Sequence, residues 1–505
     1  MHRNGIVAMR VSRQKADLVW LLLLGLLLTG LCVWLTGNNF SHELALRDWT
    51  KVLGVLDAER FRLEHLGLGA PHLPLYLLLP FAWLSPDSQG AAPYLLSGLL
   101  IAVLLTIWNH QLRHKEFALW QRVLLLMLVL LQAPVLWAAT TGGHIAFTLL
   151  VFYFIYLACL RMNFQADLRS FIMLGLSLGL LFFVDAVALF VFIALFPFFA
   201  LIAPRRIFLE APLSVYIVIA IPLGVAVLTW GYLGWIFEGR VGNFIDQPGS
   251  AFLGGWQHAV DSPWLVQYGG QWFAPLAAAF ALLLVYFPVV FLLLALVAKQ
   301  KNHLKVSLAL MLVPLITIAF ATSKFYLERP IEILAFVMVG VMAELNVIQI
   351  RKGWKFPAVV LLLVVGGVSG WHNFLQMPDP VVRDWQSALF ARLDNAHTAD
   401  VALGQFLSQH RDDDVLIDDF TAYRVIAARG DTEKMALPQS DAFKLQVRRQ
   451  VPDIDYIVVP NPRVGQGGWD RINKHFPDLY ARGMKGYQRV YDHQGWRVFK
   501  HVADR

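Results

Sequence analysis

The chain has 505 residues, of which 57% are hydrophobic and only 15% are charged. A soluble protein of this length would carry roughly a quarter charged residues, so the composition excludes an ordinary soluble globular protein. The net charge is +7, but the residues from Asn373 onward hold 18 basic and 18 acidic side chains, so the excess belongs to the apolar part of the chain. This distribution argues against nucleic acid as a partner and favours a polytopic α-helical membrane protein with basic cytoplasmic loops.

The apolar runs predict eleven membrane helices. Each run of about 18 or more apolar residues can span about 30 Å of hydrocarbon. No small-residue cleavage site follows the first run, so we interpret it as a retained helix rather than a signal peptide. Two longer charge-poor stretches are divided at the polar "TTGGH" (140–144) and at Asp185. The predicted membrane helices are 18–37, 91–110, 120–139, 143–160, 170–185, 186–203, 211–232, 273–298, 305–322, 330–349 and 355–372.

Basic residues in alternate loops predict the orientation of these helices. One set of loops holds 17 Lys and Arg residues and the other set holds 7. Because cytoplasmic loops are rich in Lys and Arg, the amino terminus is expected in the cytoplasm and the carboxyl terminus outside it. We therefore expect a multi-pass protein of the cytoplasmic (inner) membrane, with a transmembrane part over 1–372 and outer loops at 38–90 and 233–272.

The first outer loop begins with a predicted surface helix over 43–58. Apolar residues line one side of this segment, while Glu43, Arg47 and Lys51 follow one another at i, i+4 spacing on a polar side. Glycines and prolines between 67 and 74 then turn the chain back toward the bilayer. The apolar run 73–84 is too short to span, so we expect it to re-enter the membrane or to lie flat on it.

The tail, residues 373–505, has a soluble composition and predicts a small periplasmic α/β domain. Short β-rich runs alternate with polar helical stretches. The predicted strands are "DVLID" (414–418), "YIVVP" (456–460) and "WRVFK" (496–500), and the predicted helices are 381–394 and 441–450. We interpret the aspartate run "DDDVLIDD" (412–419) as a solvated loop, because it offers no set of spaced metal ligands.

Carboxylates are concentrated on the predicted outer face of the membrane part, which has 12 Asp and Glu residues against 5 on the inner face. Acidic residues contribute little to orientation, so the topology does not require this bias. In the simpler interpretation these charges only solvate a surface helix. In the functional interpretation, a carboxylate at the membrane boundary is a general base that acts on an acceptor beside an anionic lipid headgroup.

Three segments resemble the GT-C superfamily of membrane glycosyltransferases. The carboxylate-bearing first loop starts with a surface helix and ends in the Gly/Pro turn "GLGAPHLPLYLLLPFAWLS" (67–85). The segment "ATSKFYLERPIEILAFVMV" (321–339) is similar to the Lys-x-x-Tyr-x-x-Pro segment of lipid A aminoarabinose transferases and protein mannosyltransferases. The tail runs "DVLIDDFTAYRVIAARG" (414–430) and "DYIVVP" (455–460) look like the small periplasmic domains of that group.

The resemblance implies an enzyme that takes a sugar from a polyprenyl-phosphate carrier on the outer membrane face and transfers it to a glycan, lipid or protein acceptor. In the aminoarabinose-transferase branch, Asp and Glu are adjacent in the first loop. Here Glu43 and Asp48 are five residues apart, which is closer to the branch that uses polyprenyl-phosphate mannose. The resemblance therefore implies Asp48, or else Glu43, as the catalytic base.

Further candidate residues lie at the predicted outer boundary. Lys324, Tyr326 and Arg329 are expected to bind the donor phosphate, because cations stabilise the charge that develops on a leaving phosphate. Arg62 is a further candidate for the same role, and a plain interfacial anchor is the alternative. His144, beside two glycines that let a ligand approach the backbone, and His72 are expected to bind substrate, although an interhelix turn is the simpler account of "TTGGH".

Two other functions stay open from the sequence. An O-antigen ligase or polymerase is also polytopic, but such enzymes rely on Arg and His in a late loop, where this chain has only Arg240 and His258. A transporter or non-enzymatic scaffold is the second, although few charges interrupt the predicted spans. The sequence indicates no cofactor and no metal site, and it leaves open whether a divalent cation assists.

Overall fold

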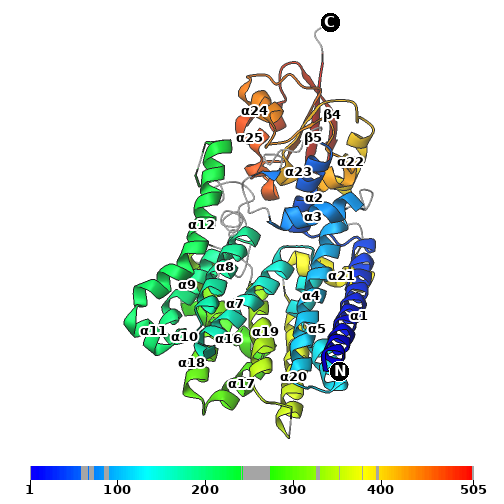
Figure 1. The fold of residues 1–505 in the computed structure, drawn as a ribbon. Coiled ribbons are helices and arrows are strands. Elements are labelled where there is room, and N and C mark those ends of the chain that lie inside the picture. Colours follow the sequence, from blue (N-terminus) through cyan, green and yellow to red (C-terminus); the bar gives the residue numbers. More distant parts are fainter. Residues whose placement is uncertain are drawn as a thin grey trace.

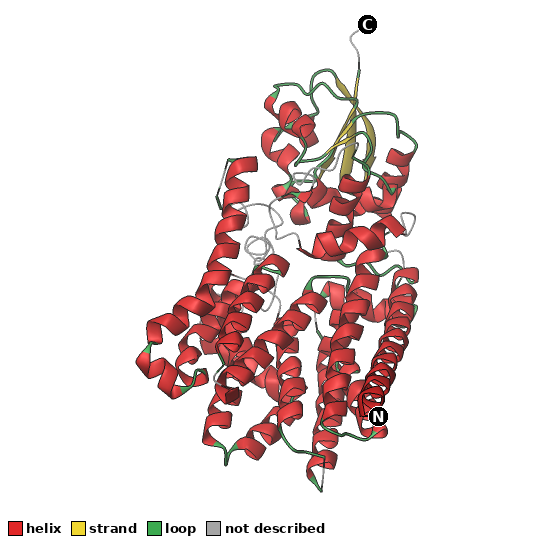
Figure 2. Ribbon diagram, in the orientation of Figure 1, coloured by secondary structure: helices red, strands yellow, loops and turns green. Residues whose placement is uncertain are grey.

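The computed structural model describes residues 2–58, 66–67, 73–84, 90–165, 167–239, 241–242, 273–325, 330–351, 353–377, 379–393 and 397–502. Most of the described chain is helical, and its strands form one sheet in the C-terminal part (Figure 2). The secondary structure thus shows a largely helical part followed by a small C-terminal sheet, while the predicted domain boundary at residue 373 stays a prediction.

The helices of the first three quarters of the chain form a bundle (Figure 1). They are α1 (His2–Gly37), α4 (Ala92–His114), α5 (Leu119–Leu130), α6 (Ala133–Thr140), α7 (Ile145–Gln165), α8 (Leu168–Val184), α9 (Val187–Leu195), η2 (Phe196–Phe198), α10 (Phe199–Ile202), α11 (Arg205–Glu210), α12 (Pro212–Glu238), α16 (Phe273–Tyr286), α17 (Val289–Val297), α18 (Lys301–Phe325), α19 (Pro330–Val347) and α20 (Lys355–Leu375).

Six of the described helices are long and apolar enough to cross a membrane, namely α1, α4, α7, α12, α18 and α20. Up to eight crossings result if each of two bent pairs, α5 with α6 and α16 with α17, counts as one span. Helix α8 and the run α9–η2–α10 are apolar but shorter. Several apolar helices thus indicate a membrane protein, while the eleven predicted crossings and their orientation stay a prediction.

Two of the predicted straight spans are broken in the structure. The segment 120–139 is a pair of helices, α5 and α6, that meet at 75°, and Pro134 lies in the first turn of α6. The segment 273–298 bends by 91° between α16 and α17, directly at Pro288. Proline has no backbone N–H and its ring clashes with the preceding turn, so it ends a helix and begins the next one.

Asp185 separates α8 from α9. Its backbone is extended, and its carboxylate accepts a hydrogen bond from Val187 N at 3.0 Å in the first turn of α9. A carboxylate in this position satisfies an amide that lacks a helical partner. The interpretation of Asp185 as the residue that divides two apolar segments is confirmed.

The predicted surface helix over 43–58 is α2 (Glu43–Leu56), and the short apolar run is α3 (Leu73–Leu84). The apolar side of α2 does not face open space, because Trp49, Val52 and Leu53 pack against Leu75 and Leu78 of α3. The two short helices therefore share a small hydrophobic core, and burial of its apolar surface orients α2.

Helix α21 (Pro380–Leu389) joins the bundle to the C-terminal part. Val382 and Trp385 belong to the hydrophobic core of the bundle, and Trp385 Nε1 donates a hydrogen bond to Thr140 Oγ1 at 2.9 Å. Asp379 caps the start of the helix by accepting from Val381 N at 2.8 Å. The helix predicted over 381–394 is therefore α21, which ends earlier, at Leu389, and packs on the bundle.

The C-terminal unit has a five-stranded sheet in the order β2-β1-β3-β5-β4. The pairs of β1 with β2 and β3 are parallel, and those of β5 with β3 and β4 are antiparallel. Its elements are α22 (Thr398–Ser408), β1 (Val415–Leu416), α23 (Asp419–Arg429), β2 (Met435–Ala436), α24 (Asp441–Arg448), β3 (Tyr456–Pro460), η3 (Gly465–Trp469), α25 (Arg471–His475), α26 (Leu479–Arg482), β4 (Tyr487–His493) and β5 (Trp496–His501). The three predicted strands correspond to β1, β3 and β5, whereas β2 and β4 were not predicted.

Helices α2 and α3 lie between the bundle and the C-terminal unit, and the amino terminus lies at the opposite end of the bundle (Figure 1). Helix α2 contacts α3 and α4 on one side and α23 of the C-terminal unit on the other. We call this end of the bundle, where α2, α3 and the C-terminal unit lie, the capped end. The described part of the first loop and the C-terminal unit thus lie at the same end of the bundle, and the assignment of this end to the outer membrane face stays a prediction.

Candidate functional site

Asp48 lies in the second turn of α2, at the capped end of the bundle. Its side chain is 11% exposed, and its Oδ2 atom lies 2.6 Å from His144 Nε2. His144 is also mostly buried, with 13% of its side chain exposed. His144 is the described residue that shares a hydrogen bond with the Asp48 carboxylate. The structure thus brings together two residues that are 96 positions apart in the chain.

The "TTGGH" turn holds His144 in this position. It joins α6 to α7, and Gly142 has a φ of +71°, a left-handed conformation that glycine adopts without strain. A Cβ atom at Gly142 would lie 2.9 Å from Ala45 Cβ and 3.0 Å from Tyr94 Cδ1, so the turn packs directly against α2 and α4. Tyr94 Oη accepts a hydrogen bond from His42 N at 2.8 Å, which fixes the start of α2 against α4.

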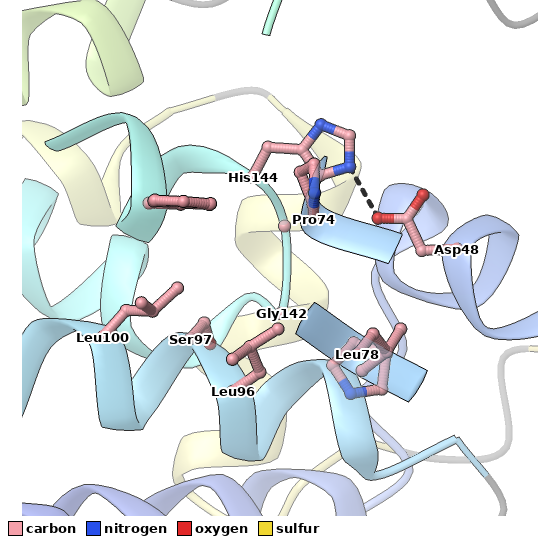
Figure 3. Close-up of a pocket in the computed structure, with 11 residues that line it drawn as sticks. Asp48, Pro74, Leu78, Leu96, Ser97, Leu100, Gly142 and His144 are labelled. Atoms are coloured by element: carbon pink, nitrogen blue, oxygen red, sulfur yellow. Dashed lines mark hydrogen bonds and ion pairs between the residues drawn. The ribbon is translucent and has the colours of Figure 1, made fainter. Parts of the chain in front are cut away.

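Asp48 and His144 line a small pocket that is partly open to solvent (Figure 3). The other lining residues come from α3, α4, the glycine turn and the start of α7: they are Pro74, Leu78, Pro93, Leu96, Ser97, Leu100, Gly142, Gly143 and Phe147. Most of these side chains are apolar. The pocket therefore has one charged group, oriented by one imidazole, against a largely apolar wall.

This arrangement suits proton transfer. The carboxylate accepts a hydrogen bond from the N–H of His144, and this contact restricts the rotation of the Asp48 side chain. A carboxylate whose one oxygen is held in this way can present the other oxygen to a hydroxyl group. The simpler interpretation of "TTGGH" as an interhelix turn is correct for its backbone, and the same turn also delivers His144 to Asp48.

Glu43, the second candidate base, faces away from the pocket contact. Its Oε1 atom forms an ion pair with Arg47 at 2.8 Å and accepts a hydrogen bond from Gln466 Nε2 at 3.1 Å. Gln466 belongs to the C-terminal unit, so Glu43 takes part in the contact between α2 and that unit. The predicted i, i+4 pair of Glu43 and Arg47 is confirmed.

The predicted phosphate-binding residues are not part of the described site. Tyr326, Arg329 and Arg62 lie outside the described residues, and so does His72. Lys324 lies in the last turn of α18, of whose side chains at this end nothing is described. Their roles stay predictions from the sequence.

The aspartate run of the C-terminal unit differs from its prediction as a solvated loop. Asp418 is fully buried: its carboxylate accepts from Phe420 N at 3.0 Å and pairs with Arg471 at 3.0 Å. Nearby, Asp470 accepts from Thr421 Oγ1 at 2.6 Å. Burial and the adjacent Asp418 carboxylate raise the pKa of Asp470 to about 7. The prediction was wrong for Asp418 because capping and ion pairing stabilise a buried carboxylate.

Sequence reasoning did not single out Gln466 or Asp418, because no local pattern distinguishes them from surface residues of the same kind. Among the residues that the structure describes, no three His, Cys, Asp or Glu side chains lie close enough to hold a metal ion. No protein-family model matches the chain, and no curated protein matches it significantly. The resemblance to GT-C enzymes therefore stays a prediction, and a function has to be argued from the site.

Proposed function

We propose that the protein is a membrane glycosyltransferase that moves a sugar from a polyprenyl-phosphate carrier to an acceptor hydroxyl on the outer face of the cytoplasmic membrane. Asp48 is the general base in this proposal, and His144 positions it. The observation that carries the proposal is the 2.6 Å contact between these two side chains in a pocket at the capped end of an apolar helical bundle.

The proposed reaction is a single displacement. The acceptor hydroxyl donates a hydrogen bond to the Asp48 carboxylate, which takes the proton as the hydroxyl oxygen attacks the anomeric carbon of the sugar. The bond between that carbon and the phosphate oxygen breaks, and the polyprenyl phosphate leaves with the electron pair. One displacement inverts the configuration at the anomeric carbon. Asp48 is left protonated and returns the proton to solvent.

The surroundings of Asp48 support the role of a base rather than that of a surface charge. Apolar neighbours such as Leu78 and Phe147 limit competition from water, which strengthens each hydrogen bond within the site. The site also lies at an end of apolar helices that are long enough to cross a membrane, where a lipid-linked donor has its phosphate. Lys324, Tyr326, Arg329 and Arg62 remain the proposed binding residues for that phosphate.

A transfer assay with the purified full chain tests the proposal. Wild-type protein in nanodiscs is incubated with a panel of polyprenyl-phosphate sugars and with envelope extract as the acceptor, and the transferred sugar is measured. We expect Asp48→Asn to lower the transfer rate by at least about 100-fold, the usual contribution of a general base. We expect His144→Gln to lower it by about 10-fold, because the carboxylate remains but is less well oriented.

Glu210→Gln is the matched control, since this carboxylate is 66% exposed and pairs with Arg206 in helix α11, away from the pocket. It should leave transfer unchanged. A thermal shift of the wild type and of Asp48→Asn by the same donor separates binding from catalysis, and both should show it. Full transfer by Asp48→Asn would show that Asp48 is not the base. If no donor of the panel is transferred by wild type or raises its melting temperature, the protein is not a transferase of this class.

A further inference from the structure

Two consecutive residues of helix α2 contact different parts of the molecule. Asp48 contacts His144 of the bundle, while the preceding residue, Arg47, contacts the C-terminal unit. Since consecutive helical residues point about 100° apart, one rotation of α2 would disturb both contacts together. The position of Asp48 is therefore linked to the C-terminal unit through the body of one short helix.

The first half of α2 is attached through Arg47. Its guanidinium donates to Gln466 Oε1 at 2.7 Å and to the carbonyl of Phe420 at 3.1 Å, and it lies 4.1 Å from the centre of the Phe420 ring. Gln466 also donates to Glu43. Arg47 is 14% exposed and Glu43 is 25% exposed, so both charges have lost much of their water. Their hydrogen bonds to one another and to Gln466 replace part of it.

The end of α2 is attached through Asp57, the residue that follows the helix. Asp57 Oδ2 accepts hydrogen bonds from Thr432 N at 2.7 Å and from Thr432 Oγ1 at 2.8 Å. Leu437 of the same unit lies against Gly54, where a Cβ atom would be 3.7 Å from its Cδ1 atom. The C-terminal unit thus holds α2 near both of its ends.

The surface that holds α2 is itself internally fixed. Phe420 lies in the first turn of α23, and Asp418 caps this turn by accepting from Phe420 N. Asp418 is in turn held by Arg471, which donates from its backbone N at 2.7 Å and from its side chain at 3.0 Å. Because the Asp418 carboxylate that accepts these bonds is buried, the start of α23, and with it the carbonyl that accepts from Arg47, has a defined position.

From these contacts we infer that the C-terminal unit is a positioning element of the active site, and that Gln466 and Thr432 are its positioning residues. They set the placement of α2, and through it the contact of Asp48 with His144. The inference rests on the proposed role of Asp48. It assigns no chemistry to the C-terminal unit, so loss of its contacts should slow the chemical step and leave donor binding nearly unchanged.

An exchange of charge between Glu43 and Gln466 tests this inference. Gln466→Glu places a second carboxylate about 3 Å from Glu43 and should lower kcat by about 10- to 100-fold, the range that a displacement on the order of 1 Å can cause. The KM for the polyprenyl-phosphate donor should change less than about 2-fold. The double variant Gln466→Glu/Glu43→Gln restores an amide–carboxylate pair and should restore kcat. Gln409→Glu, which adds the same charge at an exposed position of the unit, is the control and should have no effect.

A structural readout separates this inference from the proposed function. Hydrogen exchange of the α2 amides in the full-length chain should rise in Gln466→Glu and in Thr432→Val, and return to the wild-type rate in the double variant, while α4 stays unchanged. Loss of kcat in the double variant equal to that of Glu43→Gln alone would overturn the inference, because Glu43 would then act directly. Unchanged α2 exchange in both Gln466→Glu and Thr432→Val would also overturn it. If wild type transfers no sugar, the proposed function fails, and the exchange rates still test the positioning of α2.

Discussion

Replacement of Gly142 by alanine is expected to separate Asp48 from His144. The φ of +71° at Gly142 costs an alanine about 1–2 kcal/mol. The new Cβ atom would lie 2.9 Å from Ala45 Cβ and 3.0 Å from Tyr94 Cδ1, compared with about 3.5–4.0 Å for carbon atoms in contact. Relief of this overlap requires a shift of roughly 0.5–1 Å and costs about 1–3 kcal/mol. The free energy of unfolding should therefore fall by about 2–5 kcal/mol.

The shift of Ala45 is expected to move Asp48 as well. Ala45 is three residues before Asp48 and lies on the same side of α2, so a displaced Ala45 carries Asp48 away from the glycine turn. Gly143→Ala is the matched control: its Cβ atom would be 3.9 Å from His42 Cε1, an ordinary contact, and its φ is not in the left-handed region. That variant should change stability by less than about 1 kcal/mol.

Three measurements on the detergent-solubilised full chain check this pair of variants. They are thermal unfolding, labelling of His144 by diethyl pyrocarbonate read by mass spectrometry, and transfer from polyprenyl-phosphate sugar. Gly142→Ala should unfold at a lower temperature, label faster at His144 and transfer on the order of 100-fold more slowly. Equal behaviour of the two alanine variants in all three measurements would refute the proposed packing of the turn against α2.

Two further predictions concern buried charges away from the pocket. The folded state raises the pKa of Asp470 from 3.8 to about 7, so it retains a proton that the unfolded chain releases. The free energy of unfolding should therefore fall by up to on the order of 4 kcal/mol as the pH rises from about 4 to about 7. Asp470→Asn should remove this pH dependence, as measured by thermal unfolding at pH 5 to 8. An unchanged pH dependence in this variant would exclude Asp470 as its source. In the bundle, Glu344 accepts from His303, Ser307 and Tyr156, and its side chain is 1% exposed. Glu344→Ala should lower the free energy of unfolding by about 3 kcal/mol. Glu210→Ala, at an exposed ion pair, should lower it by less than about 0.5 kcal/mol. Similar melting temperatures for the two variants would contradict the buried network around Glu344.

The sequence was sufficient where a local pattern carries the information. Apolar runs predicted the helical bundle, the amphipathic pattern after residue 42 predicted α2 to within two residues, and β-rich runs predicted β1, β3 and β5. The i, i+4 spacing predicted the pair of Glu43 and Arg47. Each of these depends on residues that are near in the chain, where the periods of helix and strand determine which side chains are neighbours.

The sequence was insufficient where the outcome depends on an internal bend or on a distant partner. Hydropathy cannot distinguish one straight span from two short helices at 75° or 91°, and the two-residue strand β2 is too short for a pattern. The run "DDDVLIDD" looks solvated until Arg471 is placed beside Asp418. Burial of a carboxylate is decided by the partner it finds, and that partner is 53 residues away.

For the candidate site, the sequence by itself determined which groups are available: a carboxylate on an amphipathic helix and a histidine beside two glycines. Only the tertiary structure decided that Asp48 faces His144, while Glu43 faces Gln466 at a separation of 423 residues. The physical reason is that neighbouring positions on a helix point in different directions, and the packing of α2 between the bundle and the C-terminal unit selects which direction leads to the pocket.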